Sequence, residues 1–200
     1  MNPDAIKKFT ELLTALPGIG PRQAIRLAYH LVNEGKATID ELARGVSALG
    51  SLANCTNCFM VAKLGAGGLC PICADPKRNQ NLVAIVEKDT DLMSLEQAKK
   101  FNGTYLVLGE LAKDGFLSPP QKLRLNFLKS RAKQFPERSI AEVVVALNPT
   151  SYGDIQAALI IDELKSFAKK ITRLGRGLPT GGEIEFADEE TLGGAIEHRS

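Results

Sequence analysis

The sequence has 200 residues, 44% of them hydrophobic, and a formal net charge of +2. This length allows one large domain or several small modules. No apolar run approaches the ~18 residues needed to span a membrane, and so small a charge does not by itself indicate a nucleic-acid partner, because polyanion binding depends on where the basic residues lie. The N-terminal MNPDAIKKFTELL contains acids rather than a basic start and an apolar core, so we expect no secretion signal, no membrane partner and a cytoplasmic location.

Small helices are predicted across residues 1–53. Apolar residues recur at helical spacing over 4–16 and again over 21–32. The side chains expected to face inward are Ile6, Phe9, Leu12, Leu13, Leu16, Ala24, Ile25, Ala28, Leu31 and Val32. Thr38 with Glu41 forms a capping-box pattern that predicts the start of a third helix.

The turn between the first two helical patterns, LPGIGPR, is the candidate DNA contact. Gly18 and Gly20 can take positive φ and let a ligand approach the backbone closely. The helix opened by Pro21 begins with amides that lack internal partners and with the positive end of its dipole. Arg22 and Arg26 lie four residues apart on one face of that helix. The combination favours non-specific binding of a sugar-phosphate backbone, and a plain helical hairpin with solvated arginines is the alternative.

All four cysteines lie within residues 54–78, in the pairs CTNC (55–58) and CPIC (70–73). The candidate metal ligands are Cys55, Cys58, Cys70 and Cys73. A C-x2-C pair curls the backbone so that two thiolates meet one metal ion, and two pairs complete a closed tetrahedral zinc site of structural type. Two disulfides or buried free thiols are the alternatives, but a reducing compartment disfavours disulfides and free thiols do not account for the repeated spacing.

From residue 79 the pattern changes to short β-rich runs that lack alternation, which predicts strands covered on both faces. These runs are LVAIVE (82–87), TYLVLG (104–109) and EVVVALN (142–148). Helical patterns are expected at 90–100, about 127–135 and 154–170. The predicted fold class is therefore α+β and multi-module, with a small α/β domain over 79–174 whose sheet is mostly parallel, followed by a Gly-rich acidic segment over 175–200.

Charge is unevenly distributed along the chain. Residues 113–138 carry seven Lys/Arg against two acids, and 165–178 carry five with no acid. The tail from Glu183 has six acids and one arginine. A solvated surface is the plainer interpretation of each cluster, although the basic run from Lys122 to Arg138 is also a candidate lining for a DNA channel.

LPGIGPRQAIRLAYHL resembles the helix-hairpin-helix of the RecR family of recombination mediators, and the similarity continues through the four cysteines and CADPKRNQNLVAIVE to RLGRGLPTGGEIEFADEETLGGAI. The resemblance implies a helix-hairpin-helix, a four-cysteine zinc finger, a Toprim α/β domain and a C-terminal segment, assembled as a ring-like tetramer able to encircle DNA. It implies a mediator of recombinational repair that acts with RecO and RecF to load RecA on single-stranded gaps, without turnover of its own. Arg22 and Arg26 match the family's DNA-contacting positions, and Glu87 matches an acidic position implicated in partner contact.

A Toprim-type magnesium-dependent nuclease, primase or topoisomerase-like enzyme is the alternative function. Catalytic Toprim domains hold magnesium with a glutamate and a later Asp-x-Asp pair, but Asn148 and Thr150 stand where those aspartates would be. Glu87 alone cannot give a hard cation its anionic ligands. The sequence also lacks G-x4-G-K-[ST], the usual phosphate-binding loop. We therefore predict no enzyme, with an adaptor that binds only proteins as a third possibility.

The chain departs from the RecR pattern at two places. Tyr152 precedes Gly153 where the family usually has Glu-Gly, and the loop over 109–121 lacks the usual His-Gly. Both changes affect the expected partner choice more than the fold. The tail LGRGLPTGGEIEF matches a segment likened to a Walker B element, but without a partner loop we expect a structural or subunit-contact role for it.

Overall fold

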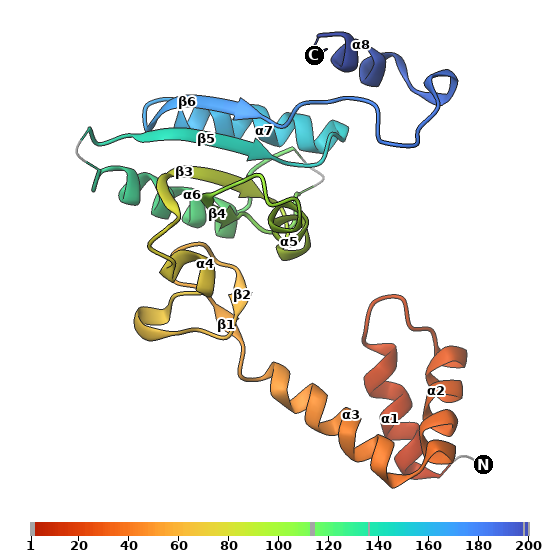
Figure 1. The fold of residues 1–200 in the computed structure, drawn as a ribbon. Coiled ribbons are helices and arrows are strands. Elements are labelled where there is room, and N and C mark those ends of the chain that lie inside the picture. The colour runs from red at the N-terminus through yellow and green to blue at the C-terminus, as the bar shows by residue number, and fades with distance from the viewer. Residues whose placement is uncertain (1–2, 113–114, 136, 198, 200) are drawn as a thin grey trace. The chain divides into compact units, whose positions relative to one another are not determined.

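The computed structural model describes residues 3–112, 115–135, 137–197 and 199. The chain divides into two compact units, Met1–Leu52 and Ala53–Ser200. Figure 1 labels the helices and strands of each unit.

The first unit contains α1 (Asp4–Thr14), α2 (Pro21–Glu34) and α3 (Lys36–Leu49). α1 and α2 pack against each other, and their buried residues are Ile6, Ala24 and Ala28. Leu12, Leu16 and Val32 were expected to face inward but are exposed, Leu12 to 63%. A pair of helices buries only the narrow stripe along which they meet, so the outer part of each predicted stripe stays uncovered.

The third helix begins earlier than the sequence pattern predicts. α3 starts at Lys36 directly after Gly35, whose φ of 94° lets the chain leave α2 and enter α3 without a longer loop. Thr38 and Glu41 therefore lie inside the helix, and no side chain caps its start. The predicted capping box is wrong.

The second unit is built on a four-stranded parallel sheet of order β4-β3-β5-β6. Its strands are β3 (Asn79–Val86), β4 (Gly103–Val107), β5 (Ile140–Ala146) and β6 (Ala168–Arg173). The last strand lies partly inside the segment predicted to be helical over 154–170. The helix ends at Leu164, and the chain then returns as an edge strand in which Lys169 and Lys170 are exposed. Polar residues are tolerated there because an edge strand is covered less completely than a central one.

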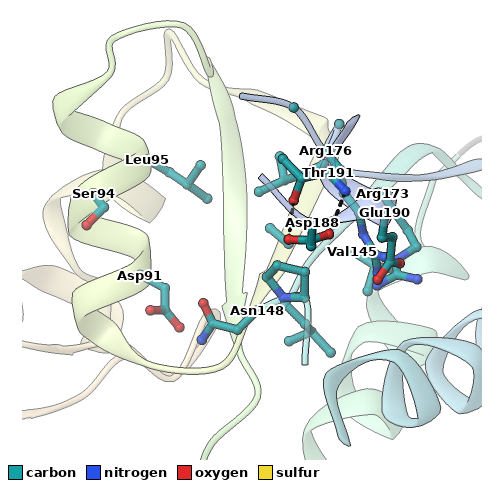
Figure 2. Close-up of a pocket in the computed structure, with 16 residues that line it drawn as sticks. Asp91, Ser94, Leu95, Val145, Asn148, Arg173, Arg176, Asp188, Glu190 and Thr191 are labelled. Atoms are coloured by element: carbon teal, nitrogen blue, oxygen red, sulfur yellow. Dashed lines mark hydrogen bonds and ion pairs between the residues drawn. The ribbon is translucent and has the colours of Figure 1, made fainter. Parts of the chain in front are cut away.

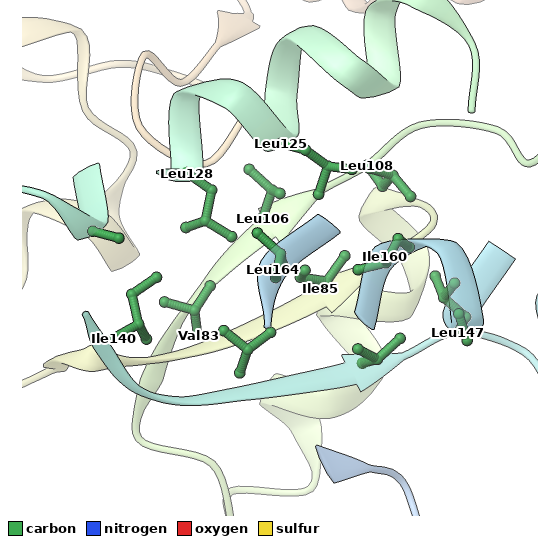
Figure 3. Packing of buried hydrophobic residues seen from close by; sticks show 14 of the residues in the cluster. Val83, Ile85, Leu106, Leu108, Leu125, Leu128, Ile140, Leu147, Ile160 and Leu164 are labelled. Atoms are coloured by element: carbon green, nitrogen blue, oxygen red, sulfur yellow. The ribbon is translucent and has the colours of Figure 1, made fainter. Parts of the chain in front are cut away.

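Helices cover both faces of this sheet. α6 (Pro119–Ala132) and α7 (Ser151–Leu164) lie on one face, where they bury a large apolar cluster (Figure 3). Its members include Val83, Ile85, Leu106, Leu125, Leu128, Val143, Ile160 and Leu164. α5 (Asp89–Gln97) lies on the other face against Ala84, Val86, Tyr105 and Val107. Alternate residues of each central strand thus enter opposite clusters, which is why those strands read as continuous apolar runs.

Two segments flank the α/β core. The cysteine segment contains β1 (Ala53–Asn54), β2 (Val61–Ala62), η1 (Ala66–Gly68) and α4 (Pro71–Ala74), and the C-terminal segment contains η2 (Ile184–Phe186) and α8 (Glu189–Glu197). The amide of Val107 in β4 donates to the carbonyl of Cys58 at 2.8 Å, and the amide of Val61 donates to Asp89 of α5 at 2.8 Å, so the cysteine segment is fastened to the α/β core.

The predicted α+β multi-module class, with a mostly parallel sheet, is confirmed. The finer division into 1–53, 54–78, 79–174 and 175–200 stays a prediction.

Candidate functional site

The four cysteines converge on one buried point. β1 and β2 pair antiparallel and bring Cys55 and Cys58 together at a turn, while Cys70 caps the start of α4 and Cys73 lies within that helix. All four sulfurs lie within 4.8 Å of one another. The Sγ atoms of Cys58 and Cys70 are 3.5 Å apart. These cysteines could hold a metal ion, because soft thiolates at this spacing form the tetrahedral donor set that zinc accepts.

Hydrogen bonds are directed at the sulfurs. The amide of Cys70 donates to Cys55 Sγ at 3.3 Å, and the amide of Cys73 donates to Cys70 Sγ at 3.4 Å. The side chain of Asn57 donates to Cys73 Sγ at 3.3 Å. The Cys58 side chain, followed by Asn57, lowers the pKa of Cys73 to about 5, whereas burial raises the pKa of Cys70 to about 11. The pKa of Cys58 is also raised, by the Cys73 side chain and by burial, so without a metal ion the hydrogen bonds favour the thiolate form of Cys73 alone.

Phe59 completes the turn that carries the first cysteine pair. It adopts a left-handed conformation with φ of 64°, unusual for a bulky residue. Its ring packs edge-on against Phe127 of α6 at 5.6 Å, and the Arg124 guanidinium lies 5.1 Å from the ring centroid. Packing against α6 therefore holds the strained turn in place.

The hairpin turn of the first unit is open to solvent. Gly18 has φ of 81°, so it needs the freedom of glycine, whereas Gly20 is extended and serves as the N-cap of α2. A Cβ at either glycine would meet no atom within 4 Å. Arg22 and Arg26 are exposed, and within the described part of the chain neither pairs with a carboxylate. The structure thus places a solvent-open turn beside two exposed guanidinium groups on the first two turns of α2.

Glu87 lies at the carboxyl edge of the sheet, immediately after β3. It is 7% exposed. Its carboxylate accepts hydrogen bonds from the Asn148 side chain at 3.3 Å and from the Leu111 amide at 3.4 Å, and Lys88 lies 3.4 Å away. Thr150 is the N-cap of α7, and its hydroxyl accepts from the Gly153 amide. Asn148 and Thr150 therefore have structural partners at the positions where catalytic Toprim domains carry aspartates.

A buried amide pair secures the loop that departs from the family pattern. Gln121 and Gln156 are buried, and the Gln121 amide donates to the Gln156 side chain at 3.3 Å and to the carbonyl of Glu110 at 3.0 Å. Gln156 in turn donates to the Ala112 carbonyl at 3.0 Å. Residues 113 and 114 of this loop lie outside the described residues. Sequence reasoning missed both glutamines, although each stands at a core-facing position of its helix.

A cavity of about 620 Å³ lies at the carboxyl ends of β5 and β6 (Figure 2). Its arginines are already paired: Arg173 and Arg176 both contact Asp154, and Arg176 also pairs with Glu190 of α8. These ion pairs hold the C-terminal segment beside the sheet, and the adjacent carboxylates of Asp154 and Glu190 offset the positive charge that an anionic ligand would need.

The basic run from Lys122 to Arg138 is not uniformly solvated. Lys122, Lys133 and Arg138 are exposed, but Lys129 pairs with Glu163 of α7. Arg131 is buried inside the unit. The Lys133 ammonium lies 6.0 Å from the centroid of the Phe167 ring. The run therefore contains residues with structural partners as well as exposed cations.

Comparisons with known proteins agree along the whole chain. The family model described as RecR, helix-hairpin-helix matches residues 6–49, the Toprim domain matches 81–175, and RecR, C-terminal matches 177–200. The curated protein Recombination protein RecR of Chromobacterium violaceum is 38% identical over 204 residues, covering 99% of this chain and 98% of that protein. Recombination protein RecR of Thermus thermophilus is 40% identical over 202 residues, covering 98% and 97%.

None of the helices that the structure describes combines the length and the apolar character needed to span a bilayer. The helical module, the parallel sheet and the C-terminal segment follow one another in the order of the three matched family models, and the cysteine cluster lies between the first two. Together with the full-length similarity to curated relatives, this order shows that the chain belongs to the RecR family.

Proposed function

We propose that the protein is a DNA-binding mediator of recombinational repair that contacts DNA through the hairpin of its first unit. The observation that carries the proposal is the open turn at Gly18 and Gly20, beside the exposed Arg22 and Arg26, neither of which pairs with a carboxylate among the described residues. Backbone amides at the start of α2 and two guanidinium groups suit phosphate oxygens, and they offer no groups that would read base edges. The expected contact is therefore independent of sequence.

We propose zinc as the metal of the four-cysteine cluster. Cys55, Cys58, Cys70 and Cys73 would hold it. Zinc supplies a structural cross-link there rather than catalysis, because four protein ligands leave no open coordination position. Its binding would fasten the β1–β2 turn to α4 in a segment with few buried residues of its own.

By resemblance to the RecR family, the proposed partners are RecO and RecF, and the proposed outcome is RecA loading on single-stranded gaps in the cytoplasm. Self-association into a ring-like tetramer fits a contact of only two arginines per chain. Several weak hairpins on one DNA gain affinity through effective concentration. Glu87 is proposed to serve partner contact by holding Leu111 and its loop, because its own carboxylate is mostly buried.

We propose no catalytic turnover. Asn148 and Thr150 carry no carboxylate that could bind a magnesium ion. Their side chains are engaged otherwise, because Asn148 donates to Glu87 and Thr150 caps α7. Magnesium-dependent cleavage or relaxation of DNA, lost on Glu87→Ala, would overturn this part of the proposal.

Replacing Arg22 and Arg26 by Ala tests the hairpin. We expect weaker binding of DNA and a salt dependence (the slope of log K against log[salt]) shallower by about 2, since about one phosphate contact is lost with each arginine. Lys8 and Lys36 are exposed basic residues of the same unit, and their double Ala variant is the charge-matched control. Fluorescence anisotropy at several salt concentrations measures both quantities. Undiminished binding at physiological salt would count decisively against the hairpin.

A further inference from the structure

Arg131 is a buried cation that pairs with no carboxylate among the described residues. It lies on α6 and is 9% exposed. Its guanidinium donates to Thr104 Oγ1 at 2.7 Å, to the Gln80 carbonyl at 3.0 Å and to Asn57 Oδ1 at 3.4 Å. In the described ranges no carboxylate forms an ion pair with it. Burying an unpaired charge is costly, so its counter-charge must come from another group.

The cysteine sulfurs can supply negative charge near Arg131 when they bind a metal ion as thiolates. Asn57 lies between them and Arg131: its side-chain oxygen accepts from Arg131, and its side-chain nitrogen donates to Cys73 Sγ at 3.3 Å. Burial lowers the pKa of Arg131, and the Cys73 and Cys58 sulfurs act in the opposite direction by favouring its charged form. A guanidinium remains charged in proteins even so.

A metal centre with four thiolates needs such a cation. Four thiolates outweigh the charge of one divalent ion, so the loaded centre is anionic. Groups that donate hydrogen bonds or positive charge to ligands orient them and set their electron density. A cavity of about 400 Å³ is lined by both Asn57 and Arg131, so the two side chains that connect α6 to Cys73 border the same hollow.

We propose that Arg131 is a positioning residue of the four-cysteine centre: acting through Asn57, it supplies the counter-charge that holds Cys73 as a ligand and limits the reactivity of the bound sulfurs toward electrophiles. This proposal rests on the proposed zinc site. Arg131 also connects the cysteine centre to the sheet, because its guanidinium donates hydrogen bonds to Thr104 of β4 and to the carbonyl of Gln80 in β3. The centre and the α/β core are thereby expected to stabilise each other.

The test uses the full-length zinc-loaded protein and its Arg131→Met variant. Lys133→Met is the matched control, since it removes one positive charge from an exposed position beyond the same helix. We expect Arg131→Met to lower zinc affinity by about 10-fold in chelator competition, and to release zinc several-fold faster on treatment with N-ethylmaleimide, a neutral electrophile. Lys133→Met should behave as the parent does.

Cobalt substitution separates this role from a merely structural one. In the cobalt-loaded protein, loss of the counter-charge should move the sulfur-to-cobalt charge-transfer band to lower energy, whereas loosened packing alone would not. Arg131→Lys keeps the charge, so its band should lie close to the parent band. If Arg131→Met does not fold, Arg131→Gln takes its place and should release zinc faster than Arg131→Lys.

Two results would overturn the proposal in different ways. Parent-like zinc affinity, release rate and cobalt band in Arg131→Met, or equal release from the Gln and Lys variants, would show that Arg131 does not act on the centre. A parent protein that contains no zinc would instead refute the zinc site itself and, with it, the role of Arg131.

Discussion

Individual polar residues in the α/β core are held in small networks, of which Glu96 is the clearest case. Its carboxylate accepts a hydrogen bond from the Tyr105 hydroxyl at 2.6 Å and pairs with Arg78, whose Nη1 lies 2.7 Å away. Arg78 precedes β3, Tyr105 lies in β4 and Glu96 lies in α5, so one carboxylate fastens three elements together. Each group satisfies the others inside a mostly apolar layer.

The stability of this network depends on pH. Arg78 holds the pKa of Glu96 below its ordinary value of 4.5. A carboxylate with a lowered folded-state pKa contributes stability that is fully present above the unfolded-state value and is lost as pH falls through the folded-state value. Glu96→Gln should therefore lower the free energy of unfolding by about 2 kcal/mol at neutral pH and flatten its decline in acid. Urea unfolding at a series of pH values measures both effects. If the free energy of unfolding of Glu96→Gln declined in acid as steeply as that of the parent, Glu96 would not be the source of this pH dependence.

Among elements, the start of α7 shows why the chain carries Thr150 and Gly153 where it does. The Thr150 hydroxyl accepts from the Gly153 amide at 3.1 Å and caps the helix. A Cβ at Gly153 would overlap the carbonyl oxygen of Asn148. The tight return from β5 into α7 therefore needs a glycine in the first turn of the helix, whatever residue stands at 152.

Gly153→Ala should destabilise the protein by about 1–3 kcal/mol, because backbone must move to admit the methyl group. The neighbouring Tyr152 is half-exposed on the same turn, and Tyr152→Ala is expected to stay within about 0.5 kcal/mol of the parent. Thermal or urea unfolding of the two variants compares them directly. Equal stabilities would mean that the turn relaxes freely and that the glycine is not required.

Sequence patterns predicted the elements whose signal is local. The paired C-x2-C spacing identified all four members of the cysteine cluster, and the apolar runs identified β3, β4 and β5, because both signals are carried by consecutive residues. β6 was missed because an edge strand needs few apolar residues and its lysines extended the helical pattern of α7. Arg131 was counted only within a basic run, although its spacing from Leu125 and Leu128 places it on the inner side of α6. Its partners, Asn57 and Thr104, come from distant parts of the chain, and no local pattern shows them.

At the scale of the whole molecule, the first unit leaves much apolar surface uncovered in a single chain. α3 has no buried residue, and its exposed side chains Ile39, Leu42, Val46 and Leu49 recur at spacings of three and four, which place them on one face. Exposed apolar surface of this extent is uncommon in a monomer and marks protein contacts. It supports the proposed self-association, in which each chain contributes one weak DNA-binding hairpin.

Val46→Glu should therefore reduce the mass of the protein in solution, because a carboxylate cannot be buried in an apolar contact without a partner. Arg44→Glu is the control, since it places the same residue elsewhere on the exposed surface of α3. Light scattering coupled to gel filtration measures the mass. DNA affinity should fall together with the mass while zinc content stays the same, since linked hairpins lose their effective concentration when the assembly dissociates. A parent protein that is monomeric with and without DNA would refute the ring, and a smaller Val46→Glu species with undiminished DNA affinity would show that one hairpin suffices.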